Sequence, residues 1–115
     1  TPQCLSELPC LSDTSWSEDW QVWLKAAAVD IRVSGPVFSL YALAVEETIN
    51  GAGVLIGHAP LVRRHLQSGE LVRPFPFSVK TPKFLTANFP KTAHLNPAAA
   101  RVLDLLRHSP QNVLR

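Results

Sequence analysis

The fold is decided by residues 33–62, which read VSGPVFSLYALAVEETINGAGVLIGHAPLV. Apolar residues in this stretch recur with the spacing of a strand, then of a helix, and then repeat both patterns. A strand that ends near Val37 leads into a helix over residues 40–50, and the apolar run at 54–56 is typical of a strand covered on both faces. Pro60 suits the first turn of the next helix. This alternation over short loops predicts an α/β fold with a mostly parallel open sheet and flanking helices.

The sequence before this stretch predicts another helix. Residues 1–15 are interpreted as a loop with one short extended piece at 9–13. Ser17 is a favoured N-cap residue, so we expect a helix from there to about Val29. The strand that follows is expected to start at Asp30. The predicted helix has one apolar stripe, made of Trp20, Trp23, Leu24 and Ala27.

The sequence after residue 59 predicts four more elements and a proline-interrupted connection at 74–82. The elements are a helix at 60–66, a strand at 71–75, a strand at 84–89, and a helix that Asn96 caps and that runs to about 107. The last helix has an apolar face, made of Ala99, Val102, Leu103 and Leu106. Such a face needs a partner, so we expect the chain to dimerise, to swap segments, or to dock this helix on its own sheet.

Length and composition limit the class of protein. The chain has 115 residues, enough for a single domain, and 46% of them are apolar, so a core can form. The net charge of +2 comes without a basic stripe, which argues against direct binding to nucleic acid. No apolar run is long enough to span a membrane. Because the sequence contains no methionine and begins with Thr1, we expect it to be a piece of a longer protein.

The residues give little support for catalysis or for metal binding. Cys4 and Cys10 are expected to be reduced thiols, with a disulfide as the alternative, and they lack the spacing of a zinc site. Glu46 and Glu47 are adjacent on a predicted helix, so their side chains point in different directions. Ser39 does not stand in the G-x-S-x-G motif of a hydrolase. We therefore expect a binding protein, not an enzyme, without catalytic residues, metal or cofactor.

The first candidate binding site lies where the strand near residue 37 passes into a helix. Ligands of open parallel sheets bind beyond the carboxyl ends of the strands, and free N–H groups at a helix start attract anions. Phe38, Ser39, Leu40 and Tyr41 occupy this position. Ser39 is interpreted either as the N-cap of the helix or as a hydroxyl that contacts the ligand. Phe38 and Tyr41 are interpreted as a wall of the site or as core residues.

The second candidate site lies at the end of the next strand, at His58. This histidine is interpreted as a polar and pH-sensitive ligand contact, or as a loop residue bonded to the backbone. Trp16 precedes the first predicted helix and is a candidate at the mouth of the cleft. Pro60 interrupts any helix between His58 and His65, so we expect no shared metal.

Five blocks of the sequence together resemble one known family. They are residues 11–24 with three tryptophans, 35–39 (GPVFS), 50–57 (NGAGVLIG), 60–62 (PLV) and 68–75 (SGELVRPF). Their order and spacing resemble the substrate-binding domain of LysR-type transcription regulators, in the subgroup that includes regulators of glycine cleavage and of β-lactamase expression. The resemblance covers most of the chain. The DNA-binding head and the first effector lobe of that family have no counterpart in it.

The resemblance implies a fold like that of type 2 periplasmic binding proteins, in which a ligand lies between two α/β lobes. Residues 1–115 would form a single domain fragment, with the second effector-binding lobe at 9–76, a hinge and return strand at 77–92, and a helix at 96–108 that packs on the missing first lobe. The resemblance also implies effector contacts at 38–40. Family members often have arginine where this chain has His58, so a charged contact there is not carried over.

The function that the resemblance implies is ligand sensing. The effector is expected to be a small carboxylate, amino acid or peptide-like metabolite that favours the closed form of the domain. In such regulators the change passes through a homo-oligomer to a winged helix-turn-helix, which alone contacts DNA. The implied location is the cytoplasm, without membrane contact.

Two other functions stay open at this point. A solute-binding receptor of a transport system has the same fold and would need a secretion signal or lipid anchor upstream. An enzyme of the aminotransfer or deaminase kind uses a similar lobe and would need an acid–base set that the sequence does not show. The residues upstream of Thr1 would distinguish the three functions.

Overall fold

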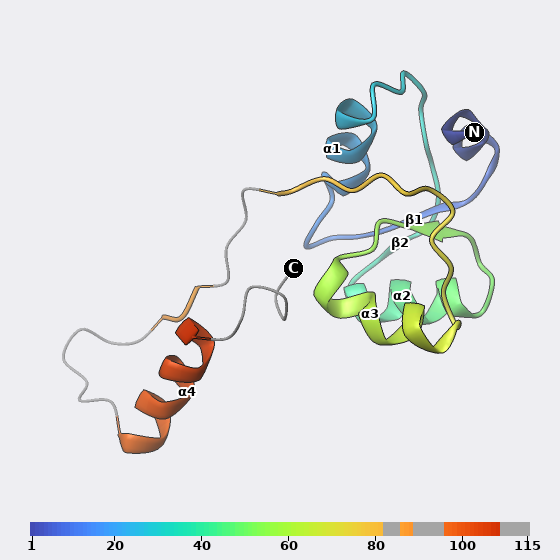
Figure 1. Ribbon diagram of the computed structural model, residues 1–115. Helices are drawn as coiled ribbons and strands as arrows, with labels where there is room; N and C mark the ends of the chain where they lie inside the picture. The colour runs from blue at the N-terminus through green and yellow to red at the C-terminus, as the bar shows by residue number, and fades with distance from the viewer. Residues whose placement is uncertain (82–85, 89–95, 109–115) are drawn as a thin grey trace. The chain divides into compact units, whose positions relative to one another are not determined.

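A computed structural model of the chain describes residues 1–81, 86–88 and 96–108 (Figure 1). The chain divides into two compact units, residues 1–79 and 80–115. The elements of the first unit are the 3-10 helix η1 (Pro2–Glu7), β1 (Cys10–Asp13), α1 (Asp19–Ala26), β2 (Val37–Phe38), α2 (Tyr41–Ile49), β3 (Val54–Leu55) and α3 (Ala59–Ser68). The second unit contains α4 (Pro97–His108).

The three strands form one parallel sheet in the order β2-β1-β3, with β1 at its centre. Asp13 is paired with Phe38 on one side, and Leu11 is paired with Leu55 on the other. Backbone hydrogen bonds extend the β2 side of the ladder, because Cys10 N donates to Ser34 O over 2.9 Å. The predicted α/β fold with a parallel sheet and flanking helices is therefore confirmed.

The sequence-based prediction underestimated the segment at 9–13. It was interpreted as an extended piece within a loop, but it contains the central strand of the sheet. Cys10, Leu11 and Asp13 are all buried, and β1 has partners on both sides. The apolar–polar alternation that marks a half-buried strand is absent here because both faces of β1 are covered.

Two strand predictions were wrong in extent or existence. Residues 30–33 are not part of a strand, because the pairing with β1 begins only at Ser34. Residues 71–75 form no strand either. Pro74 has no N–H to donate to a ladder, and the Arg73 guanidinium instead donates to the carbonyl oxygens of Phe75 and Pro76 over 3.1 and 3.0 Å. The predicted strand at 84–89 lies mostly outside the described residues, and 86–88 have no regular structure.

The predicted starts of two helices were also wrong. The N-cap of α1 is Glu18, not Ser17, because residues 15–18 form a turn in which Asp19 N donates to Trp16 O over 3.1 Å. The N-cap of α2 is Leu40, which makes no side-chain cap. Ser39 therefore does not cap the helix as one of its two interpretations required.

The remaining helix signals were interpreted correctly. Pro60 lies in the first turn of α3, and Gly69 ends that helix in the left-handed conformation, with a φ of 79°. Asn96 caps α4, because its Oδ1 accepts a hydrogen bond from Ala99 N over 2.8 Å. Val102 and Leu106 of the predicted apolar face are exposed. That 96–108 packs on a first lobe and that 77–92 form a hinge stay predictions.

Two clusters of buried side chains make up the core of the first unit. One contains Leu5, Cys10 and Trp20, and the other contains Tyr41, Val45 and Val62. Figure 1 shows α1 on one side of the sheet and α2 with α3 on the other, which matches this division. The central strand is therefore enclosed by helices on both faces, and its end at Asp13 is held in a fixed position.

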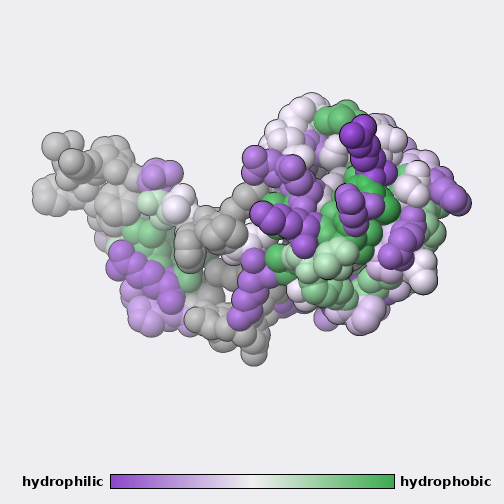
Figure 2. Space-filling model, turned by 90° about the horizontal axis from the view of Figure 1, so that it is seen from above, coloured by the Kyte–Doolittle hydropathy of each residue, from purple (hydrophilic) through white to green (hydrophobic). Residues whose placement is uncertain are grey.

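The surface of the chain mixes apolar and polar residues. Apolar and polar areas alternate on the face that Figure 2 shows, where the chain is seen from above. None of the helices in the described part combines the length and apolar character that a membrane span needs.

Cys4 and Cys10 are free thiols, as expected, and burial raises the pKa of the Cys10 thiol.

Candidate functional site

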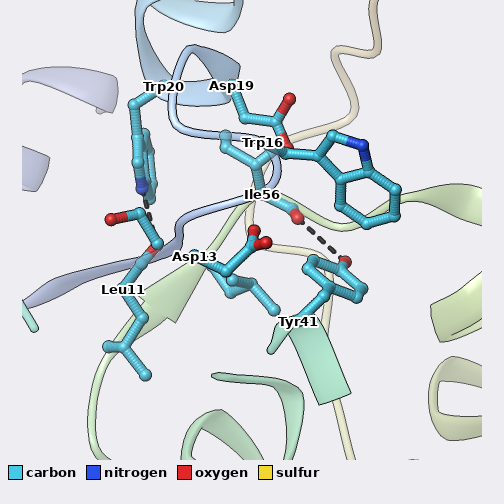
Figure 3. A pocket seen from close by; sticks show the side chains of 9 residues that line it. Leu11, Asp13, Trp16, Asp19, Trp20, Tyr41 and Ile56 are labelled. Atoms are coloured by element: carbon cyan, nitrogen blue, oxygen red, sulfur yellow. Dashed lines mark hydrogen bonds between the residues drawn. The ribbon is translucent and has the colours of Figure 1, made fainter. Parts of the chain in front are cut away.

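The carboxyl ends of all three parallel strands lie at the same edge of the sheet, and a small pocket opens there. It is a shallow hollow without room for a water molecule inside, and its empty space of about 180 Å³ includes open solvent. Figure 3 shows the side chains around it. They come from β1, the turn after it, α1, the start of α2 and the end of β3, and are Leu11, Ser12, Asp13, Trp16, Asp19, Trp20, Tyr41, Leu55 and Ile56.

The Tyr41 hydroxyl links the two candidate sites that the sequence predicts at the starts of two helices. It donates to Ile56 O over 3.0 Å and accepts from His58 N over 2.9 Å. Tyr41 stands in the first turn of α2, whereas Ile56 and His58 connect β3 to α3. One buried side chain therefore fixes the spacing between the starts of two helices.

Trp16, Tyr41 and His58 form an aromatic cluster at this edge. The ring centres of Trp16 and His58 are 3.9 Å apart, and those of Trp16 and Tyr41 are 4.8 Å apart in an edge-on arrangement. The His58 Nε2 atom also makes a hydrogen bond with Asp19 Oδ2. The structure thus brings three of the six predicted site residues together, with Trp16 and Tyr41 in the lining of the pocket and His58 packed against both rings.

Phe38, Ser39 and Leu40 lie at the same strand edge but do not line this pocket. Phe38 is half-buried, Ser39 is exposed, and Leu40 is 59% exposed. The carbonyl oxygen of Ser39 accepts a hydrogen bond from Thr14 Oγ1 over 3.3 Å. Their predicted contact with a ligand would therefore take place outside the pocket, on the open surface beside it.

Sequence reasoning missed two carboxylates of the site, Asp13 and Asp19. Asp13 is only 2% exposed, and its Oδ2 accepts a hydrogen bond from Ser15 N over 3.0 Å. Asp19 begins α1 and faces His58. An interpretation of residues 9–13 as a strand would have placed Asp13 at a carboxyl end and so identified it. The described residues contain no group of three metal-type ligands.

Burial raises the pKa of Tyr41 to about 12, and the negative charges of Asp19 and Asp13 act in the same direction. The hydrogen bond from His58 N lowers it by a smaller amount. The neutral phenol is thus the form that the folded site holds, and only this form can donate to Ile56 O.

Tyr41 is the only tyrosine in the chain, so its titration can be followed directly. We expect the tyrosinate absorbance to rise with a midpoint near pH 12 in the folded chain, and near its ordinary value of 10.0 in denaturant. Because the folded state favours the neutral phenol, the stability that it contributes is complete below about pH 10 and is lost as the pH rises to about 12. Tyr41→Phe should remove this loss. Equal midpoints in the folded and denatured chain would contradict the burial of the hydroxyl.

Comparison with known proteins gives one consistent result. The family model described as "LysR substrate binding domain" matches residues 1–111. The chain is 36% identical over 70 residues to the HTH-type transcriptional activator AmpR of Citrobacter koseri. This match covers 60% of the chain and 25% of the relative. It is 38% identical over 65 residues to the HTH-type transcriptional regulator DsdC of Escherichia coli K12. That match covers 56% of the chain and 21% of the relative.

A longer match includes the second unit. The chain is 33% identical over 106 residues to the HTH-type transcriptional regulator TrpI of Pseudomonas aeruginosa, which covers 90% of the chain and 35% of the relative. The chain therefore spans about a fifth to a third of the length of these curated relatives. No solved structure gives a significant match.

Proposed function

The chain belongs to the LysR substrate-binding domain family, and on that premise we propose that it is part of the ligand sensor of a transcription regulator. Its role is to bind a small-molecule effector at the carboxyl edge of the parallel sheet. Trp16 and Tyr41 line the pocket, with His58 packed against both rings, and Phe38, Ser39 and Leu40 form the open side of the site. The relatives named above are transcription regulators, which supports binding without catalysis.

The observation that carries the proposal is that the Tyr41 hydroxyl joins the starts of α2 and α3 at one pocket. Ligand pockets of proteins usually enclose roughly 300–1,000 Å³. The hollow in this chain holds no cavity of that kind, because its empty space of about 180 Å³ includes the open solvent around it. A site of this kind fits one half of a cleft that a second lobe completes.

The mechanism that we propose is a shift between two populations. An effector that contacts both lobes binds the closed arrangement more tightly and moves the equilibrium by that difference in affinity. The regulator passes the change through a homo-oligomer to a winged helix-turn-helix, which contacts DNA. This assembly works in the cytoplasm, with a carboxylate, amino acid or peptide-like metabolite as its effector.

The test is a thermal-shift screen on the full-length protein with acetate, glycine, L-serine, L-tryptophan and L-alanyl-L-alanine. At least one probe is expected to raise the unfolding midpoint in a concentration-dependent way. His58→Ala should lower the affinity for that probe by about tenfold, because the variant loses an aromatic and hydrogen-bonding contact in the site. His65→Ala is the matched control, since His65 lies on α3 and pairs with Glu70. Equal effects of the two variants, or no response to any probe, would refute the proposal.

A further inference from the structure

The imidazole of His58 is held in one orientation by residues of two helices and a turn. Its Nε2 atom makes a hydrogen bond with Asp19 Oδ2 in the first turn of α1. The centre of the ring lies 3.9 Å from that of the Trp16 ring and 5.1 Å from that of the Tyr41 ring, which meets it at an interplanar angle of 81°. An ionised carboxylate only accepts hydrogen bonds, so the proton between His58 and Asp19 belongs to Nε2.

The other ring nitrogen of His58, Nδ1, stays accessible. In the part of the chain that the structure describes, this atom makes no hydrogen bond. Every buried polar side-chain atom of those residues has a partner, so the unpaired Nδ1 lies on the exposed part of the ring. The His58 side chain is 19% exposed. One edge of the imidazole therefore faces solvent, while the other edge faces α1.

One turn supplies both the carboxylate and the aromatic contact. Residues 15–18 form this turn, in which Asp19 N donates to Trp16 O over 3.1 Å. The bond that the second nitrogen of a histidine makes decides where the ring proton lies and how the ring is oriented. Groups that contact a ligand are placed most precisely when such a partner stands on a helix or strand. Asp19, the first residue of α1, meets both conditions.

The charges near His58 indicate which kind of group Nδ1 meets. Asp13 and Asp19 both line the adjacent hollow, and no lysine or arginine is among its described lining residues. The Tyr41 phenol beside the ring is neutral, because burial raises its pKa to about 12. A carboxylate that approached Nδ1 would therefore be repelled by two carboxylates of the protein. A neutral imidazole with its proton on Nε2 offers a lone pair at Nδ1, which accepts a hydrogen bond.

We infer that Asp19 is a positioning residue of the effector site: it holds the ring proton on Nε2 of His58 and so makes Nδ1 the atom that accepts a hydrogen bond from an N–H or O–H group of the effector. The inference rests on the proposed function, because it names the atom and the kind of contact at that same site. It requires no cavity, since Nδ1 is reached from solvent. Effectors whose only polar group is a carboxylate do not make this contact.

The first test locates the ring proton in the full-length protein by nuclear magnetic resonance with isotope-labelled histidine, at a pH where the ring holds a single proton. The signals of His58 are identified by their loss in His58→Gln. We expect a proton on Nε2 that exchanges slowly with water, because its bond to Asp19 protects it, and no proton on Nδ1. Asp19→Ala should abolish the slow exchange. Glu18→Ala should retain it, because Glu18 is exposed and its side chain caps no helix.

Two results of this test would overturn the inference. One is a proton on Nδ1 in the unaltered protein, and the other is equally slow exchange in Asp19→Ala. If Asp19→Ala does not fold, the spectrum of the unaltered protein decides alone. A purely structural role of Asp19 at the start of α1 would lower stability but leave the ring proton where it is.

The second test measures binding by calorimetry with probes that differ in one donor. Glycine is paired with trimethylglycine, L-serine with O-methyl-L-serine, and L-alanyl-L-alanine with L-alanyl-N-methyl-L-alanine. In at least one pair the donor member should bind about tenfold tighter or more, and Asp19→Ala should remove that preference while Glu18→Ala keeps it. A probe that binds without any preference, or with the same preference in Asp19→Ala, overturns the inference and leaves the proposed function intact. Binding by no probe overturns both.

Discussion

Gly35→Ala is expected to lower the free energy of unfolding by about 3 kcal/mol or more, because overpacking against an immobile neighbour allows little relaxation. A Cβ at residue 35 would lie 2.6 Å from Cys10 N and 2.7 Å from Cys10 C, and closer still to Cys10 O. All three are backbone atoms of the central strand. Moving them would break the hydrogen bonds that Ser34 O and Pro36 O accept from β1.

Urea unfolding measures this effect, and Gly51→Ala is its control. Gly51 has a φ of 87° and no atom within 4 Å of an added Cβ. Its replacement should cost only the strain of the left-handed backbone, roughly 1 kcal/mol. If Gly35→Ala were no more destabilising than Gly51→Ala, the close approach of residue 35 to β1 would be incorrect.

Leu11→Ala is expected to lower the free energy of unfolding by about 2–5 kcal/mol, the range for removing a large buried aliphatic side chain. Leu11 is 0% exposed and lies in β1, where it is paired with Leu55. Its carbonyl oxygen accepts the Trp20 Nε1 hydrogen bond over 2.8 Å, and this contact is retained in the variant. The loss therefore reports the packing of the side chain alone.

The control for Leu11→Ala is Leu61→Ala on α3, where the leucine is 51% exposed. This change should cost well under half as much, because about half of the side chain is already in water. Chemical denaturation of both variants under the same conditions gives the comparison. Equal losses would show that β1 is not enclosed on both faces.

Much of the fold could be predicted from local signals. Pro60, Gly69 and Asn96 each define a helix end through their own backbone or side-chain chemistry, and the structure confirms all three. The predictions at Ser17 and Ser39 failed because a favoured cap residue is only a local preference. At Ser17 a competing local turn prevailed, because the hydrogen bonds that Asp13 and Trp16 accept in it delay the helix to Asp19.

The candidate site was only partly predictable for a related reason. Tyr41 and His58 could be placed at one edge because parallel strands share the direction of their carboxyl ends. Trp16 joins them only through the turn after β1. Asp13 and Asp19 were missed because their importance depends on β1 being the central strand, and strand order is a non-local property.

The contact between Trp16 and His58 gives the site its own optical signal. The three tryptophans have different neighbours: Trp20 donates to Leu11 O, Trp23 packs on Phe75 and Phe77, and Trp16 packs on the imidazole. A ligand that displaces the His58 ring from Trp16 is therefore expected to change the emission of Trp16, and a titration can be followed without an attached dye.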